Sequence, residues 1–174
     1  FGDTVIFGNT ERGVDFLLEV AYDKFDGYAV GNLQANFARA DGATAVVNVV
    51  GLAALPANEV QKVASVVTNG TGLTINVAGG NTVIGAIGGV NLDDVALNTA
   101  NNLTITNTVT LAGLETFDAS GVVGDLTMAL SGAADGAGFA FTAADGTTTL
   151  TLNGVTAGTH SSFSADAAAN FNLV

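Results

Sequence analysis

The segment 126–130 has the sequence LTMAL, in which large apolar residues alternate with threonine or alanine. In an extended chain, the apolar side chains of such a segment all point to one side. The same alternation recurs at 73–77, 103–106 and 150–152. A period of two is typical of β-strands that bury one face. The chain from Thr71 onward is therefore predicted to consist of short β-strands.

The spacing of these segments indicates how the strands stack. Segments that begin with Leu-Thr start at positions 73, 103, 126 and 150, so they recur at similar but unequal steps along the chain. A loose repeat of this kind is typical of stacked coils. Abundant Gly and Asn, with a single Pro in the whole chain, favour a mainly β fold of the parallel β-solenoid or β-roll type.

An antiparallel β-sandwich is the alternative. Three turn-forming pairs follow one another closely, and each suits a positive φ: Asp135-Gly136, Asp145-Gly146 and Asn153-Gly154. Two-residue turns at such short intervals are typical of hairpins. Both alternatives predict a β-rich region from Thr71 onward.

The part of the chain before Thr71 has a different pattern. Apolar residues recur at helical spacing over 14–25, although the same stretch also alternates with period two, so a strand is the alternative there. A second helix is predicted over 58–67, because Pro56 stands just ahead of it. We therefore expect a mixed, partly helical part at 1–70 and a β-repeat part at 71–174, with one continuous domain as the alternative.

The composition excludes several classes of function. The chain has 16 Asp and Glu against 4 Lys and Arg, and its net charge of −12 disfavours binding to nucleic acid or to an anionic membrane surface. Without Cys there is no thiolate zinc site, and the single histidine, His160, lacks the G-x-S-x-G context of a hydrolase. The uncharged stretch 63–92 is interrupted by Asn and Gly, so no membrane span is predicted. We expect a protein that is not an enzyme.

Carboxylates at turns point to calcium. After Lys62 the chain has eight acidic residues and no basic residue, so a divalent ion would relieve self-repulsion in the folded state. Oxygen ligands at turns suit Ca²⁺ better than Mg²⁺. Two of the candidates belong to a tetrad, AADG, that occurs at 133–136 and again at 143–146. The predicted calcium ligands are Asp118, Asp125, Asp93, Asp94, Asp135 and Asp145.

The segment 111–127, LAGLETFDASGVVGDLT, resembles a repeat of large bacterial surface-layer proteins and RTX-type adhesins. The resemblance extends over about 71–155. It implies a secreted protein with β-roll coils, in which G-G-x-G-x-D-x-U-x nonapeptides bind calcium. No complete nonapeptide is present, and the related segment GGNTVIG at 79–85 has Asn81 where the family has Asp.

We therefore expect an extracellular structural subunit that assembles with copies of itself into a surface layer, a filament or an adhesin scaffold, with cell-surface polysaccharide as a further partner. Uncharged strands such as 71–77 and 102–111 lack the usual protection against pairing of sheet edges. The alternative is a calcium-dependent carbohydrate- or ice-binding module, which threonine-rich runs such as 147–149 favour. The chain begins with Phe1 rather than Met, so an upstream segment is expected to have been removed or left out.

Overall fold

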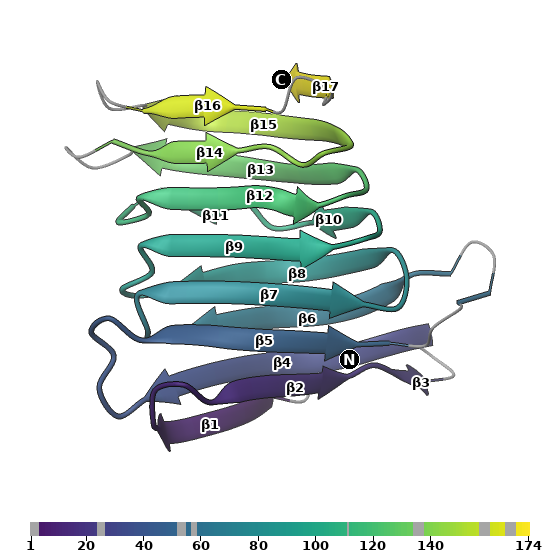
Figure 1. Ribbon diagram of the computed structural model, residues 1–174, viewed down its shortest axis with the longest axis vertical. Coiled ribbons are helices and arrows are strands. Elements are labelled where there is room, and N and C mark those ends of the chain that lie inside the picture. Colours follow the sequence, from purple (N-terminus) through teal and green to yellow (C-terminus); the bar gives the residue numbers. More distant parts are fainter. Residues whose placement is uncertain are drawn as a thin grey trace.

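The chain folds into a stack of coils built from two β-sheets (Figure 1). The computed structural model describes residues 4–23, 27–51, 55–56, 59–110, 112–133, 138–156, 161–165 and 170–174, and within these ranges it contains seventeen strands and no helix. Parallel strands that stack with one strand of each sheet per coil define a parallel β-solenoid. The predicted fold class is thereby confirmed, and the antiparallel β-sandwich alternative is wrong.

The larger sheet has ten strands in the described part of the chain. In order along the stack it contains β1 (Thr4–Thr10), β4 (Gly27–Phe37), β6 (Gln61–Thr68), β8 (Thr82–Gly89), β10 (Leu103–Ile105), β13 (Leu126–Ala133), β15 (Thr147–Thr156) and β17 (Asn170–Leu173). Two further strands join it from the side: β11 (Val109–Thr110), parallel to β13, and β3 (Ala21–Asp23), antiparallel to β4.

The smaller sheet has seven strands, all paired in parallel. In order along the stack it contains β2 (Asp15–Glu19), β5 (Thr44–Val50), β7 (Gly72–Ala78), β9 (Asp94–Thr99), β12 (Thr116–Val122), β14 (Ala140–Thr142) and β16 (Ser162–Ser164). The chain passes from the smaller to the larger sheet at one side of the stack, which we call the first corner, and returns at the other side, the second corner (right and left in Figure 1).

The core between the sheets consists of columns of stacked side chains. In the smaller sheet, Phe117 pairs with Phe141, which in turn pairs with Phe163. The rings of Phe117 and Phe141 are stacked with centroids 5.7 Å apart, and both are fully buried. In the larger sheet, Leu150 pairs with Leu173 in the same way. Each coil therefore buries the apolar side chains of the coil beside it.

The pairing explains why the repeat in the sequence is loose. Leu103 pairs with Leu126, so the step between these two Leu-Thr segments is a true coil length. Leu73 lies in β7 of the smaller sheet, so the longer step from Leu73 to Leu103 joins positions on different sheets. Leu126 pairs with Thr148, so the step from Leu126 to Leu150 extends slightly beyond one coil.

The helix predicted over 14–25 is wrong. This stretch contains β2 and β3 instead. In β2, Phe16 and Leu18 are buried while Leu17 between them is exposed, which is the burial pattern of a strand. The strand alternative was the correct one, because pairing with β5 provides the sheet that an isolated segment lacks.

The helix predicted over 58–67 is also wrong, since β6 occupies most of it. Its buried residues are Gln61, Val63, Val66 and Thr68, so an interval of three stands between two intervals of two. The register with β4 and β8 does not shift at this point, and β8 has the same interval of three, so the neighbouring strands share the irregularity. The resulting mixture of intervals imitates the spacing of a helix.

The predicted boundary between 1–70 and 71–174 falls inside the stack. On either side of it β5 pairs with β7 and β6 pairs with β8, so both sheets continue through this point without interruption. The coils before it are longer than those after it. Gln61 is separated from its preceding partner, Tyr28, by many more residues than from its following partner, Thr82. The change in texture along the sequence therefore marks a change in coil length within one stack.

Candidate functional site

Asp125 lies at the first corner, between β12 and β13, where its carboxylate contacts the next coil. Its Oδ1 accepts a hydrogen bond from the backbone N–H of Thr147 at 2.8 Å. The N–H of Asp125 donates to Oδ1 of Asn102 at 2.9 Å, and the N–H of Asn102 donates to Oδ1 of Asn81 at 3.2 Å. We call Asn81, Asn102, Asp125 and Thr147 the corner ladder. In this ladder the side chain of each coil binds the backbone of the next, so the carboxylate of Asp125 has a structural partner.

Asp118 and Asp145 lie at different places relative to Asp125. Asp118 is exposed in the middle of β12, and its Oδ1 accepts the N–H of Ser120 at 2.9 Å. Asp145 is exposed at the first corner, one coil beyond Asp125, and its N–H donates to the carbonyl of Val122 at 2.9 Å. The structure therefore brings Asp125 and Asp145 to one corner, and it places Asp118 within a strand instead.

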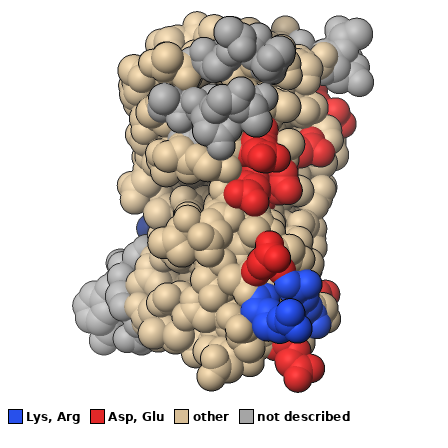
Figure 2. All heavy atoms as spheres, turned by 90° about the vertical axis from the view of Figure 1, so that its left-hand side faces the viewer, with Lys and Arg blue, Asp and Glu red and all other residues tan. Residues whose placement is uncertain are grey.

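Asp93 and Asp94 lie at the second corner, just before and at the start of β9. Asp94 accepts a hydrogen bond from the hydroxyl of Thr116 on the next coil, with 2.6 Å between the oxygens. The backbone N–H of Glu115 donates to the carbonyl of Asp93, so a third carboxylate follows one coil further on. Figure 2 shows this side of the molecule, on which acidic side chains occur at several levels and a basic patch lies near the end of the stack that contains β1 and β2.

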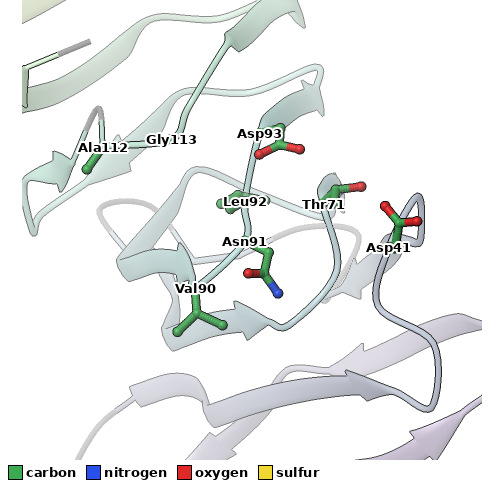
Figure 3. Close-up of a pocket in the computed structure, with 8 residues that line it drawn as sticks. All are labelled: Asp41, Thr71, Val90, Asn91, Leu92, Asp93, Ala112 and Gly113. Atoms are coloured by element: carbon green, nitrogen blue, oxygen red, sulfur yellow. The ribbon is translucent and has the colours of Figure 1, made fainter. Parts of the chain in front are cut away.

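A depression of about 490 Å³ lies beside Asp93 at the second corner (Figure 3). Its lining comes from successive coils: Asp41, Thr71, Val90, Asn91, Leu92, Asp93, Ala112 and Gly113. The carboxylates of Asp41 and Asp93 both belong to it, on either side of the coil that carries Thr71. Its lining combines polar residues with apolar ones such as Val90, which is strongly exposed.

The described residues bring no three His, Cys, Asp or Glu side chains together in a group that could hold a metal ion. Of the predicted calcium ligands, Asp135 lies outside the described residues. The single histidine, His160, lies outside them as well. The other five are distributed over the first corner (Asp125 and Asp145), the second corner (Asp93 and Asp94) and the outer face of the smaller sheet (Asp118).

A second ladder of asparagines was not anticipated. Asn48, Asn76 and Asn98 pair across β5, β7 and β9 on the outer face of the smaller sheet. The side-chain N–H of Asn98 donates a hydrogen bond to Oδ1 of Asn76 at 2.9 Å. The side-chain N–H of Asn76 donates in the same way to Oδ1 of Asn48, also at 2.9 Å. A shallow depression of about 600 Å³ runs beside them, with Val50 and Val123 in its lining. Asparagines that recur at the spacing of one coil are the signal that could have identified this ladder.

The two ends of the stack expose apolar side chains. The edge strands are β1, β2 and the short β3, which pairs only with β4, at one end, and β16 and β17 at the other. In β17 the side chain of Leu173 is 56% exposed, and in β1 that of Val5 is 48% exposed. The uncharged stretches 71–77 and 102–111, which were expected to be unprotected edges, lie instead within the stack, where β7 stands between β5 and β9, and β10 between β8 and β13. That expectation is wrong, and the unprotected edges are the end strands.

Comparisons with protein-family models, with curated proteins and with solved structures found no match to this chain. In the part of the chain that the structure describes, no helix is long and apolar enough to cross a membrane. The function must therefore be inferred from the fold and from its surfaces.

Proposed function

We propose that this protein is an extracellular structural subunit, which assembles with copies of itself into a surface layer, a filament or an adhesin scaffold. One observation carries the proposal: of the five end strands, β1, β16 and β17 contain no charged residue, whereas β2 and the short β3 contain acidic residues. Edge strands of soluble proteins are ordinarily protected by charges, by Pro or by a covering element. Uncharged end strands instead favour pairing with another chain.

The architecture supports the same proposal. In a solenoid each coil contacts only its neighbours, and soluble solenoids have terminal coils with a polar outer face. Here the described end coils have exposed apolar residues at core-facing positions, such as Val5, Phe7 and Leu173. Another layer of the same kind would remove this surface from water, as every inner coil already does for its neighbours.

The test is the state of the purified chain over a wide range of concentrations. Light scattering should show a mass that increases with concentration, and electron microscopy should show ordered fibres or sheets. The circular dichroism spectrum should remain that of a β protein, which distinguishes ordered assembly from aggregation of unfolded chains. A species with the mass of one chain at every concentration, with no ordered structure on the grid, would contradict the proposal.

Calcium belongs to this proposal as an ion that stabilises the stack. Its support is the placement of carboxylates on neighbouring coils, with Asp125 and Asp145 at one corner and Asp93, Asp94 and Glu115 at the other. A bound cation would reduce their repulsion. We expect the midpoint of thermal unfolding to rise in millimolar calcium relative to chelator, and by more than in magnesium. Equal midpoints, with no metal detected by elemental analysis, would remove calcium from the proposal.

One observation favours a second candidate, the carbohydrate- or ice-binding module. Thr104, Thr127 and Thr149 pair with one another on the outer face of the larger sheet, so their hydroxyl groups form a row across three coils. Such a row can bind ordered water or sugar hydroxyl groups by hydrogen bonds. Inhibition of ice recrystallisation, or binding on a glycan array that is lost in Thr127→Lys and retained in Ser120→Lys on the other sheet, would establish this candidate.

A further inference from the structure

We propose that Asn153 is a site of spontaneous deamidation, at which the folded protein slowly exchanges a carboxamide for a carboxylate. The inference goes beyond the proposed function and does not depend on it. The chain contains two Asn-Gly pairs, Asn69-Gly70 and Asn153-Gly154. The structure holds the first pair in place and leaves the second open, and this difference carries the inference.

The reaction is a cyclisation within one Asn-Gly pair. The backbone nitrogen of the glycine gives up its proton to hydroxide and attacks Cγ of the asparagine. As the new N–Cγ bond forms, the Cγ–Nδ2 bond breaks, and the side-chain nitrogen takes up a proton and leaves as ammonia. Water then opens the five-membered succinimide at one of its two carbonyls, which gives aspartate or isoaspartate. Glycine suits the reaction because it has no Cβ and adopts a wide range of backbone angles.

At Asn69 the group that would be attacked is bound at both of its polar atoms. Oδ1 accepts a hydrogen bond from the backbone N–H of Phe37 at 2.7 Å, and Nδ2 donates to the carbonyl of Phe37 at 3.1 Å. Rotation of this side chain toward the backbone nitrogen of Gly70 would break both hydrogen bonds. The fold therefore keeps Cγ of Asn69 away from the nitrogen that attacks it.

The glycine of this first pair is held as well. Gly70 is buried, and its N–H donates a hydrogen bond to Oγ1 of Thr68 at 3.0 Å. A Cβ added at Gly70 would lie 2.5 Å from the carbonyl oxygen of Ala43, so the backbone of another coil lies directly beside it. Cyclisation at Asn69 thus requires that this part of the stack opens first.

At Asn153 the side chain is open to water. Asn153 and Gly154 are both exposed. Leu150 and Leu152 pack on the core side of β15, so the alternation of the strand directs Asn153 to the outer face of the larger sheet. In the described part of the chain, its carboxamide has no hydrogen-bond partner. A strand pairs with its neighbours through its edges, so pairing leaves this outer face uncovered.

The backbone after Asn153 is irregular. Asn153 pairs with Ser131 of β13, but the next pairing in register joins Thr156 to Ala133, so β15 has one residue more than β13 in this interval. An extra residue of this kind stays outside the ladder and bends its strand. Gly154 lies in the interval with a φ of +62°, and an added Cβ there meets none of the neighbouring described atoms within 4 Å. The backbone of Gly154 therefore has the room that Gly70 lacks.

The products would change this face of the larger sheet. Thr110 pairs with Ser131, which pairs with Asn153, so the row around Asn153 is uncharged. Deamidation introduces a carboxylate into this row. Isoaspartate also lengthens the backbone by one carbon atom, next to the place where the pairing of β15 with β13 is already irregular. Reaction at Asn153 would thus alter both the charge of the surface and the local pairing.

The experiment follows both Asn-Gly pairs in the same full chain by peptide mapping with mass spectrometry, which resolves the small gain in mass when NH2 is replaced by OH. In the folded chain, Asn153 should react about tenfold or more faster than Asn69, because the hydrogen bonds at Asn69 must break first. In concentrated urea the two pairs should react at similar rates, since the fold no longer distinguishes them.

The control variant is Asn153→Gln, whose longer side chain would have to close a six-membered ring and therefore reacts far more slowly. It should remove the heavier peptide that contains position 153 and leave the slow reaction at Asn69 unchanged. Circular dichroism before and after the incubation establishes that the chain stayed folded. This separates reaction of the folded protein from reaction of a small unfolded fraction.

Every other outcome overturns the inference. If Asn153 is as unreactive as Asn69 in the folded chain while both react in urea, β15 holds its pair in spite of the irregular pairing. If both react equally fast in the folded chain, the hydrogen bonds at Asn69 give no protection and the structure does not select the site. If neither pair reacts even in urea, Asn153 is not a deamidation site.

Discussion

The inner coils and the end coils of this protein are built from the same kinds of residue, but they differ in burial. Leu150 and Leu173 are neighbours in one column, yet Leu150 is fully buried and Leu173 is more than half exposed. In the first coils, Leu33 and Val5 show the same contrast. In a solenoid the burial of a side chain is therefore conferred by the adjacent coil, and not by the coil to which the residue belongs.

The contrast also separates stability from assembly. Inner residues have a coil on both sides, so their loss is felt in the folding of the single chain. End residues have a coil on one side only, so they contribute less to folding, and their free side is available for a partner. Variants in the two regions should accordingly affect different measurements, and the following predictions test this difference.

The largest expected effect comes from a ring in the middle of a column. Phe117→Ala removes a fully buried ring that is stacked on Phe141, and the free energy of unfolding should fall by about 3–5 kcal/mol. Phe7→Ala is the matched change at the end, where the ring is 41% exposed, and it should cost only about 1–2 kcal/mol. Urea unfolding measures both. Equal losses would show that the end coil is as well packed as the inner ones.

A smaller effect is expected where a glycine lets two coils approach. A Cβ at Gly85 in β8 would collide with the carbonyl oxygen of Ala64 in β6, so Gly85→Ala should lower the free energy of unfolding by about 1–3 kcal/mol. At Gly8 in the end strand β1, an added Cβ meets none of the neighbouring described atoms within 4 Å. Gly8→Ala should therefore leave stability unchanged or raise it by up to about 1 kcal/mol. A loss at Gly8 similar to that at Gly85 would contradict the contrast.

The sheet-forming part of the fold could be predicted from the sequence. Alternation in a segment such as 126–130 reports burial on one side, and this signal does not depend on which strand lies next to it. The loose repeat from Thr71 onward then favoured stacked coils. Both inferences use local patterns and the length of a coil, which the chain carries in itself.

The helix predicted over 58–67 shows where local patterns fail. Val63 and Val66 both face the core, because the alternation in β6 shifts by one residue between them. From the sequence alone this shift cannot be told from a helical interval of three. Only the pairing of β6 with β4 and β8 resolves it.

The candidate site was the least predictable part, since it depends on where each strand ends. Asp118 and Asp125 are close together in the sequence, and both were predicted to be calcium ligands at turns. β12 extends to Val122, so Asp118 lies within the strand and Asp125 at the first corner. The same limit applies to the corner ladder, whose members Asn81, Asn102 and Asp125 are related only once the register is known.

The smallest expected effect concerns the corner ladder, and it depends on a coil being present on both sides of Asp125. Asp125→Ala removes the acceptor for the N–H of Thr147, and the free energy of unfolding should fall by about 1 kcal/mol. Asp125→Asn keeps an oxygen in the same place, so it should restore stability to within about 0.3 kcal/mol. The matched control is Asp118→Ala, which removes an exposed carboxylate whose partner is the nearby N–H of Ser120, within its own strand, and should cost less than Asp125→Ala. If Asp125→Asn is instead as unstable as Asp125→Ala, and the difference from the unchanged chain disappears in chelator, the negative charge of Asp125 is what matters. A bound cation, rather than the hydrogen bond to the next coil, would then be its main contribution to the stack.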